Sequence, residues 1–211
     1  MLKGEGSPTP SRRSRCFCSR SLPRSLLGGC VDLVLDLRRG TLNDRSHLKV
    51  ASDPRYFTYL SDAAVHPTVV EGDARLSLKA EPAGRFDLLI LDAFSSDSPP
   101  VHLLTVEAVQ DEIRTVKSSG LLAFHISNRY YDLAPAVAAA ASSQGLTVLK
   151  RSHSPGLVRE PGETPSRWLV ASRDGATIAL LRARGWTDAR AADHPFTDDY
   201  SDLIRYLRLG G

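Results

Sequence analysis

The sequence predicts an α/β fold, a doubly wound sandwich in which helices cover both faces of a mostly parallel sheet. The first observation behind this prediction is that short apolar runs alternate with segments of helical spacing along most of the chain. Strands separated by helices of about 10–15 residues are joined by right-handed crossovers, which make their pairing parallel. The second is composition: 42% of the 211 residues are hydrophobic and 24% are charged, as in a globular domain with a sizeable core.

The predicted strands are short apolar runs bounded by turn residues. FDLLILDAF (86–94) is the clearest, because an unbroken apolar run between charged ends is typical of a parallel strand buried on both faces. VDLVLDL (31–37) fits a strand or the start of a buried helix, and its periodicity does not decide between them. The other predicted strands are the first part of TVVEGDARLSL (68–78), LLAFHIS (121–127), LTVLKR (146–151) and SRWLVASR (166–173).

The predicted helices have apolar residues at helical spacing and recognisable ends. VHLLTVEAVQDEIRTVK (101–117) is amphipathic, Thr105 is its candidate cap, and the Ser-Ser-Gly at 118–120 ends it. APAVAAAASSQG (134–145) has a proline in its first turn and a glycine just past its end. The remaining predictions are helices in residues 45–62 with a break at Asp53–Pro54, after the turn at Gly72–Asp73, and at 176–185, and a loop at 152–165.

The basic residues are concentrated at the N-terminus. Residues 1–30 contain six basic residues and one acidic residue, whereas the rest of the chain contains 21 basic and 23 acidic residues. Residues 1–27 are rich in Ser, Arg, Pro and Gly, so we expect a disordered basic tail there and a folded domain over 28–211. After residue 30 the sequence shows no clustered basic face of the kind that binds nucleic acid, so no nucleic-acid partner is expected.

The cysteines and the hydropathy pattern exclude further classes. Three cysteines at positions 16, 18 and 30 lack the paired spacing of a structural zinc site, and their odd number argues against a disulfide framework. We therefore expect free thiols in a reducing compartment, no metal, and a cytoplasmic location. No run of about 18 uncharged apolar residues is present, so no membrane partner is expected for this chain.

Polar residues follow three of the predicted strands. Ligands of open parallel sheets bind beyond the carboxyl ends of the strands, and carboxylates are rarely buried without a partner. A plain alternative is that these residues only form turns and helix caps, which Asp and Ser both favour. The residues concerned are Glu71, Gly72 and Asp73, then Asp92, Ser95, Ser96 and Asp97, then Ser127, Asn128, Arg129 and Tyr130.

Asp92 and Asp97 bracket a loop that ends in Pro99–Pro100. Two carboxylates in one pocket can divide two tasks: one can hold an ammonium group, and the other can accept a proton from an attacking amine. An acidic cleft also favours a cationic electrophile. This pattern suits transfer of an alkyl group from a sulfonium to an amine.

Five segments carry a resemblance to a known family. The segments DPRYFTYL, VVEGDARLSL, FDLLILDAFSSDSPPVHLLT, LLAFHISNRYYDL and FTDDYSDL resemble the spermidine synthase (polyamine aminopropyltransferase) family, in its bacterial spermidine synthase-like branch. The resemblance runs from about Asp44 to the C-terminus and leaves the N-terminal part unmatched. It implies a Rossmann-like fold similar to that of S-adenosylmethionine-dependent methyltransferases.

The resemblance also implies roles for individual residues. Asp92 would be the catalytic proton acceptor, and the co-substrate would be decarboxylated S-adenosylmethionine. The second substrate would be a diamine such as putrescine, and a homodimer is left open. The residues implied to bind the diamine are Asp97, Ser96 and Tyr200, and those implied to bind the nucleoside are Asp73, Ala74 and Asp44.

The sequence departs from the family at its start. The family's Gly-x-Gly-x-Gly loop would fall near residues 22–30, where only Gly28 and Gly29 stand, and its small N-terminal β-domain is absent. A catalytically impaired remnant or binding module of the same fold, or an S-adenosylmethionine-dependent methyltransferase, are therefore the alternatives. For His102 and His125 we expect packing or hydrogen bonding rather than catalysis.

Overall fold

The structure is a computed structural model that describes residues 53–56, 58, 61–62, 70, 72–92, 99–155 and 163–208. The predicted tail at 1–27 and the segment 31–37 lie outside the described residues, as do most of 45–62 and the strand expected before Gly72. The proposed domain boundary at residue 28 therefore stays a prediction.

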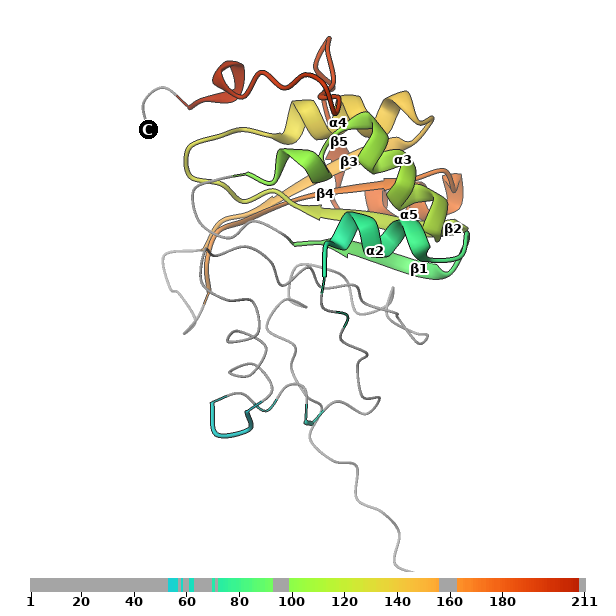
Figure 1. The fold of residues 1–211 in the computed structure, drawn as a ribbon. Coiled ribbons are helices and arrows are strands. Elements are labelled where there is room, and N and C mark those ends of the chain that lie inside the picture. Colours follow the sequence, from blue (N-terminus) through green and yellow to red (C-terminus); the bar gives the residue numbers. More distant parts are fainter. Residues whose placement is uncertain are drawn as a thin grey trace, which may run out of the picture.

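Five strands form one sheet in the order β1 (Phe86–Leu91), β2 (Val116–His125), β4 (Ser166–Ser172), β3 (Thr147–His153) and β5 (Thr187–Asp188). The α/β fold class is confirmed, and Figure 1 shows the helices packed on this sheet. Among the described strands, β1 and β2 pair in parallel and the other three pairs are antiparallel.

The antiparallel pairing of β3 and β4 and the parallel pairing of β1 and β2 follow from the segments that connect these strands. β3 and β4 follow one another along the chain with no described helix between them, so they can pair as neighbours running in opposite directions. β1 and β2 are joined through a helix, and such a crossover makes the pairing parallel. The described sheet is thus mixed, and the expected parallel pairing applies to its first two strands.

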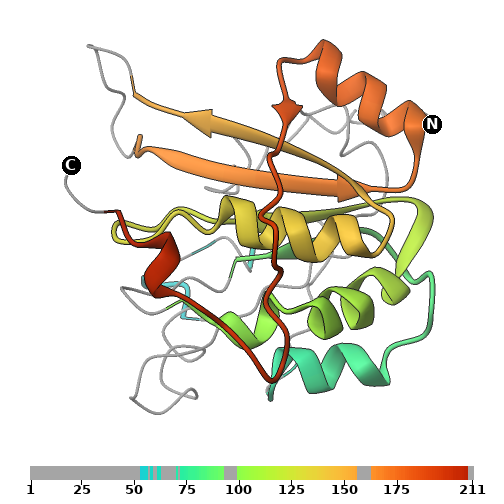
Figure 2. The ribbon, with the colours of Figure 1, turned by 90° about the horizontal axis from the view of Figure 1, so that it is seen from above.

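Helices cover both faces of the sheet. α2 (Ala74–Ala80), α3 (Val106–Thr115) and α4 (Ala134–Ser143) lie side by side on one face, and α5 (Gly175–Ala183) lies on the other (Figure 2). Two short 3-10 helices, η2 (Val101–Leu103) and η3 (Ile204–Tyr206), complete the described elements. No helix in the described ranges is long and apolar enough to cross a membrane.

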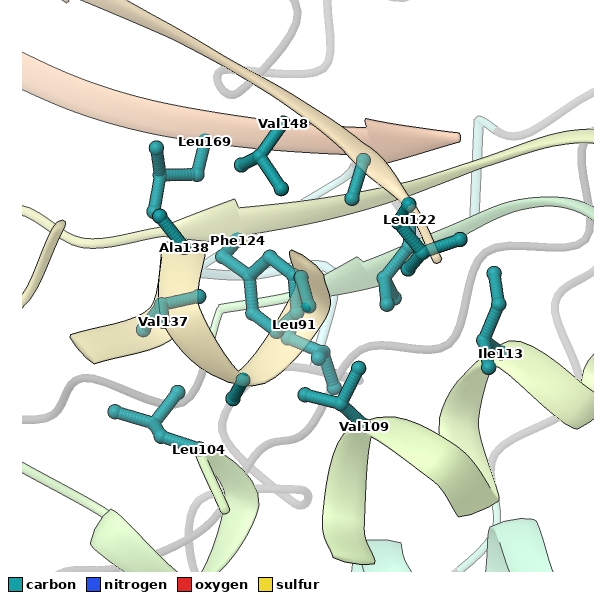
Figure 3. Close-up of a cluster of buried hydrophobic side chains, with 14 of the residues drawn as sticks. Leu91, Leu104, Val109, Ile113, Leu122, Phe124, Val137, Ala138, Val148 and Leu169 are labelled. Carbon is teal, nitrogen blue, oxygen red and sulfur yellow. The ribbon is translucent and has the colours of Figure 1, made fainter. Parts of the chain in front are cut away.

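The core divides into two layers because successive side chains of a strand point to opposite faces. One layer joins the sheet to α2, α3 and α4, and Figure 3 shows part of it: Leu91, Leu122, Phe124 and Leu169 of the strands with Val109, Ile113 and Val137 of the helices. The other layer joins the sheet to α5 and contains Leu88, Ile90, Leu121, Ala123, Trp168, Val170, Ile178 and Leu181. Burial on both faces confirms the prediction made from the run FDLLIL.

One predicted boundary is wrong. The helix expected over 101–117 is η2 followed by α3, and β2 begins at Val116, so the residues expected to end the helix lie inside a strand. Glycine suits position 120 because β1 and β2 approach each other closely there. A Cβ on Gly120 would lie 2.9 Å from the carbonyl oxygen of Asp87 and 2.6 Å from Cγ1 of Val116.

Candidate active site

The register of β1 and β2 brings Asp92 and His125 together. Leu91 pairs with Phe124 in this parallel pair, so the next residue of each chain segment lies at the carboxyl end of the sheet. Oδ1 of Asp92 lies 2.6 Å from Nδ1 of His125, and each side chain is 23% exposed. A carboxylate and an imidazole thus meet at the edge where open α/β sheets bind their ligands.

His125 is held on a second side by Trp168. The two residues are opposite each other in the antiparallel pair of β2 and β4, and their rings stack with centroids 4.6 Å apart and planes 24° apart. Trp168 is buried in the layer of the core that faces α5. The imidazole ring is therefore fixed both in its plane and at one of its nitrogens.

The Asp92–His125 pair can move a proton. If the carboxylate accepts a hydrogen bond from Nδ1–H, the neutral ring presents the lone pair of Nε2, and the protonated ring presents a donor there. Within the described part of the chain, no hydrogen bond to Nε2 is formed. The sequence analysis assigned His125 to packing or hydrogen bonding, and the hydrogen bond it forms is with the carboxylate predicted to be catalytic.

A sequence signal for this pair existed. Leu88–Asp92 reads LLILD and Leu121–His125 reads LLAFH, so each strand has four apolar residues before its polar one. The structure aligns these two segments residue by residue, from Leu88 with Leu121 to Leu91 with Phe124. Two predicted parallel neighbours with the same pattern would have placed Asp92 beside His125.

Asp73 lies at the same edge of the sheet but has a structural task. It is the N-cap of α2, and its Oδ1 accepts a hydrogen bond of 3.1 Å from the backbone N–H of Leu76. α2 leads into β1 and runs in the opposite direction, so the N-terminal end of α2 lies near the carboxyl end of β1. Ala74 is the first residue of this helix.

A further carboxylate, Asp198, forms a bidentate ion pair with Arg75, which we call the Arg75–Asp198 clip. Both nitrogen–oxygen distances are 2.7 Å, and the hydroxyl of Thr105 donates a third hydrogen bond of 2.7 Å to Asp198. The N–H of Asp198 donates to Glu107 at 3.0 Å. Chiefly because of the hydrogen bonds from Arg75, the pKa of Asp198 is lowered to about 2.

The Arg75–Asp198 clip ties the C-terminal segment to α2, η2 and α3. Arg75 belongs to α2 and also donates to the carbonyl of His102 in η2 and to Asp111 in α3, each at 3.2 Å. Thr105 is the N-cap of α3, as predicted, and its Oγ1 accepts from the N–H of Ala108. The clip therefore joins four segments on the side of the sheet that α2 and α3 cover.

Tyr200 lies in the C-terminal segment and is 59% exposed. Its backbone exchanges hydrogen bonds with Thr197, and its side chain lines a cavity of about 40 Å³. That cavity is formed by the C-terminal segment itself, with His194, Phe196, Asp202, Arg205 and Tyr206 as the other lining residues. In this segment Asp198 contacts α2 and α3, and the carbonyl of Phe196 accepts a hydrogen bond of 2.9 Å from the N–H of Val106 in α3, whereas Tyr200 is largely exposed.

The remaining predicted site residues, Asp44, Ser96 and Asp97, lie outside the described residues. Of the aspartates predicted to follow the strands, Asp73 and Asp92 are found at the same edge of the sheet, and the place of Asp97 stays a prediction. Within the described ranges, no group of three or more His, Cys, Asp and Glu side chains could hold a metal ion.

The chain matches no protein-family model and no curated protein. Among solved structures, it is similar to a probable spermidine synthase from Corynebacterium glutamicum, with 17% identity and a TM-score of 0.43 over 64% of this chain and 57% of that one. It is also similar to a spermidine synthase in complex with the transition-state analogue AdoDATO, with 15% identity and a TM-score of 0.44 over 79% of this chain and 54% of that one.

A third similar structure is MnmC2 from Aquifex aeolicus, with 24% identity and a TM-score of 0.36 over 52% of this chain and 31% of that one. The chain thus spans between about a third and somewhat more than half of the length of these solved proteins. The likeness concerns the fold alone.

Proposed function

We propose that this protein is a spermidine synthase-like aminopropyltransferase that moves the aminopropyl group of decarboxylated S-adenosylmethionine to a diamine such as putrescine. The observation that carries the proposal is the place of Asp92, a partly exposed carboxylate at the carboxyl end of a buried parallel strand, beside a histidine. The family resemblance of the segment around Asp92 supports the same role.

The chemistry needs a proton acceptor and a cation-binding cleft. A diamine is protonated in neutral water and attacks only after its nitrogen has lost a proton. The nitrogen lone pair then forms a bond to the aminopropyl methylene carbon, while the carbon–sulfur electron pair returns to sulfur and methylthioadenosine leaves. Both substrates are cations, so carboxylates at this edge would favour their binding and stabilise the charge that remains during transfer.

The roles of the other residues follow from the resemblance. Asp92 would accept the proton, Asp97 with Ser96 and Tyr200 would contact the diamine, and the nucleoside would be held by residues at the start of α2 and before it. Those nucleoside contacts would be Asp73, Ala74 and Asp44. The exposed side chain of Tyr200 in this structure would have to turn toward the cleft to take part.

The test uses the purified full chain with putrescine and decarboxylated S-adenosylmethionine, and mass spectrometry of the products. We expect spermidine and methylthioadenosine, and we expect Asp92→Asn to lower turnover by about 100-fold or more, the contribution of a general base. Asp87→Asn is the matched control, because Asp87 is an exposed carboxylate of the same strand, paired with Lys117.

Two results would contradict the proposal. Calorimetry that detects no binding of methylthioadenosine or of decarboxylated S-adenosylmethionine would remove the co-substrate and favour an impaired remnant. Methylated products formed from S-adenosylmethionine, without aminopropylated ones, would favour a methyltransferase instead.

A further inference from the structure

We propose that a cleft beside the first turn of α4 binds a small molecule that carries a phosphate group. The cleft has a volume of about 350 Å³ and is lined by residues of β3, β4 and β5 and of the segment between β2 and α4. Pockets that bind small molecules have volumes of about 300–1,000 Å³. None of the described residues assigned above to aminopropyl transfer lines this cleft, so the inference is independent of the proposed function.

The register of three strands builds one side of the cleft from polar side chains. Lys150 and Ser152 follow Val148 on β3 at a spacing of two residues, so the three side chains point to the same face of the sheet. Val148 is buried on this face in the core layer that includes α4. Ser152 is opposite Arg167 of β4, and Lys150 is opposite Thr187 of β5. These four polar side chains therefore share one face, and we call them the polar floor of the cleft.

The positive charge of the polar floor is only partly balanced. Within the described ranges, the ammonium group of Lys150 forms no ion pair. Oδ1 of Asp132 lies 3.5 Å from a nitrogen of Arg167 and 3.8 Å from a nitrogen of Arg208. Both distances exceed the roughly 2.7–2.9 Å of a strong charged hydrogen bond, and one carboxylate faces two guanidinium groups. The excess of positive charge is local, because the chain after residue 30 contains 21 basic and 23 acidic residues.

The donors of the polar floor match a phosphate group. Arg167 offers a planar fork of N–H donors and Lys150 a compact ammonium group, and both are common partners of phosphate oxygens. Diagonal neighbours on adjacent strands lie about 7–8 Å apart, so these two long side chains can converge on one group. The hydroxyls of Ser152 and Thr187 can each donate a further hydrogen bond. A phosphate monoester carries a charge of about −1.5 to −2 at pH 7, which complements the excess of positive charge.

The rest of the lining suits the organic part of such a ligand. Ile126, Ala134 and Trp168 line the cleft beside the polar floor, and small-molecule pockets combine apolar lining with a few polar groups that fix orientation. Arg151 also lines the cleft, but its guanidinium donates a hydrogen bond of 3.1 Å to the carbonyl of Arg184, so we do not assign it to the ligand. The substrates of aminopropyl transfer are cations, which the polar floor would repel, so the ligand is a different molecule.

The test titrates the purified full chain with phenyl phosphate in a phosphate-free buffer of constant ionic strength, and calorimetry measures the binding. We expect saturable binding at one site, and we expect Lys150→Gln and Arg167→Gln each to weaken it by about tenfold, as for loss of one hydrogen bond to a charged group. Lys117→Gln is the matched control, because Lys117 is an exposed lysine of β2 that pairs with Asp87 and does not line the cleft. That variant should bind as the wild type does.

A second variant gives a result that misfolding cannot imitate. Asp132→Asn removes the carboxylate that competes for Arg167, so phenyl phosphate should bind about threefold more tightly, as for loss of one partly exposed like charge. Nitrogen-15 NMR should show backbone amide shifts concentrated at the polar floor when phenyl phosphate is added. The proposal would be overturned by the absence of saturable binding at millimolar phenyl phosphate, by equal affinities of Lys150→Gln and Lys117→Gln, or by amide shifts confined to other residues.

Discussion

Two aspartates at the carboxyl edge of the sheet have partners of opposite character. Asp198 is bonded by a guanidinium and a hydroxyl, neither of which changes charge near neutral pH. Asp92 is bonded by an imidazole, a side chain whose ring nitrogens can both donate and accept a proton. The partner of an aspartate, rather than its residue type, therefore decides whether it stabilises the fold or can take part in proton transfer.

The two centres also lie on different layers of the molecule. Asp92 and His125 continue the strand positions that face α5, whereas Arg75 and Thr105 stand at the N-terminal ends of α2 and α3. The helices on that face are therefore held together by the ion pair of Arg75 and Asp198. The strand ends hold the hydrogen-bonded pair of Asp92 and His125, which is partly exposed.

The largest expected effect comes from breaking the Arg75–Asp198 clip. Arg75 is 13% exposed at its side chain and pairs with two carboxylates, so Arg75→Met leaves Asp198 and Asp111 without their guanidinium. We expect a loss of about 3 kcal/mol in the free energy of unfolding, as for removal of a largely buried guanidinium that pairs with two carboxylates. Chemical denaturation followed by circular dichroism measures it.

The control for this variant is an exposed ion pair of the same kind. Arg182 lies 2.5 Å from Asp188, and their side chains are 48% and 68% exposed, so Arg182→Met should cost about 0.5 kcal/mol or less. Equal losses in the two variants would show that the clip is no more than a surface ion pair, and the contrast with Asp92 would lose its basis.

The Arg75–Asp198 clip could not be predicted from the sequence. Arg75 and Asp198 are 123 residues apart, and no local sequence pattern indicates that their side chains form an ion pair. The strands, the capping of α3 by Thr105 and the edge position of Asp92 could be predicted, because each depends on near neighbours and on period-2 burial. The start of β2 could not, because the closeness of Gly120 to Asp87 depends on another strand.

A third carboxylate differs from both, because no hydrogen-bond partner for it lies among the described residues. Glu112 is fully buried in α3, and within the described ranges neither of its carboxylate oxygens forms a hydrogen bond. Burial raises its pKa well above the ordinary value of 4.5. The folded state therefore holds this proton to higher pH than the unfolded state, and stability falls as pH rises from about 4.5 through the folded pKa.

The variant Glu112→Met should remove that fall. We expect a gain of about 2 kcal/mol in the free energy of unfolding at pH 7, since an uncompensated buried polar group is replaced by an apolar one of similar volume, and a smaller gain at pH 5. Denaturation curves at several pH values measure both. Parallel dependences of wild type and variant on pH would mean that Glu112 is compensated in solution.

The smallest expected effect is that of Asp198→Asn, which removes the charge of Asp198 and keeps the shape of its side chain. Because its pKa is lowered to about 2, the unfolded state binds this proton first as pH falls below about 4. The stability contributed by the Asp198 charge is therefore present above pH 4 and is lost as pH falls toward 2. Asp198→Asn keeps the shape but gives up this contribution, so we expect it to cost about 1 kcal/mol at pH 7, limited by the 42% exposure of the side chain. At pH 2, where much of the folded protein holds the proton, the difference between variant and wild type should be clearly smaller than at pH 7, and denaturation at both pH values tests this. A difference as large at pH 2 as at pH 7 would assign the role of Asp198 to geometry rather than to its charge.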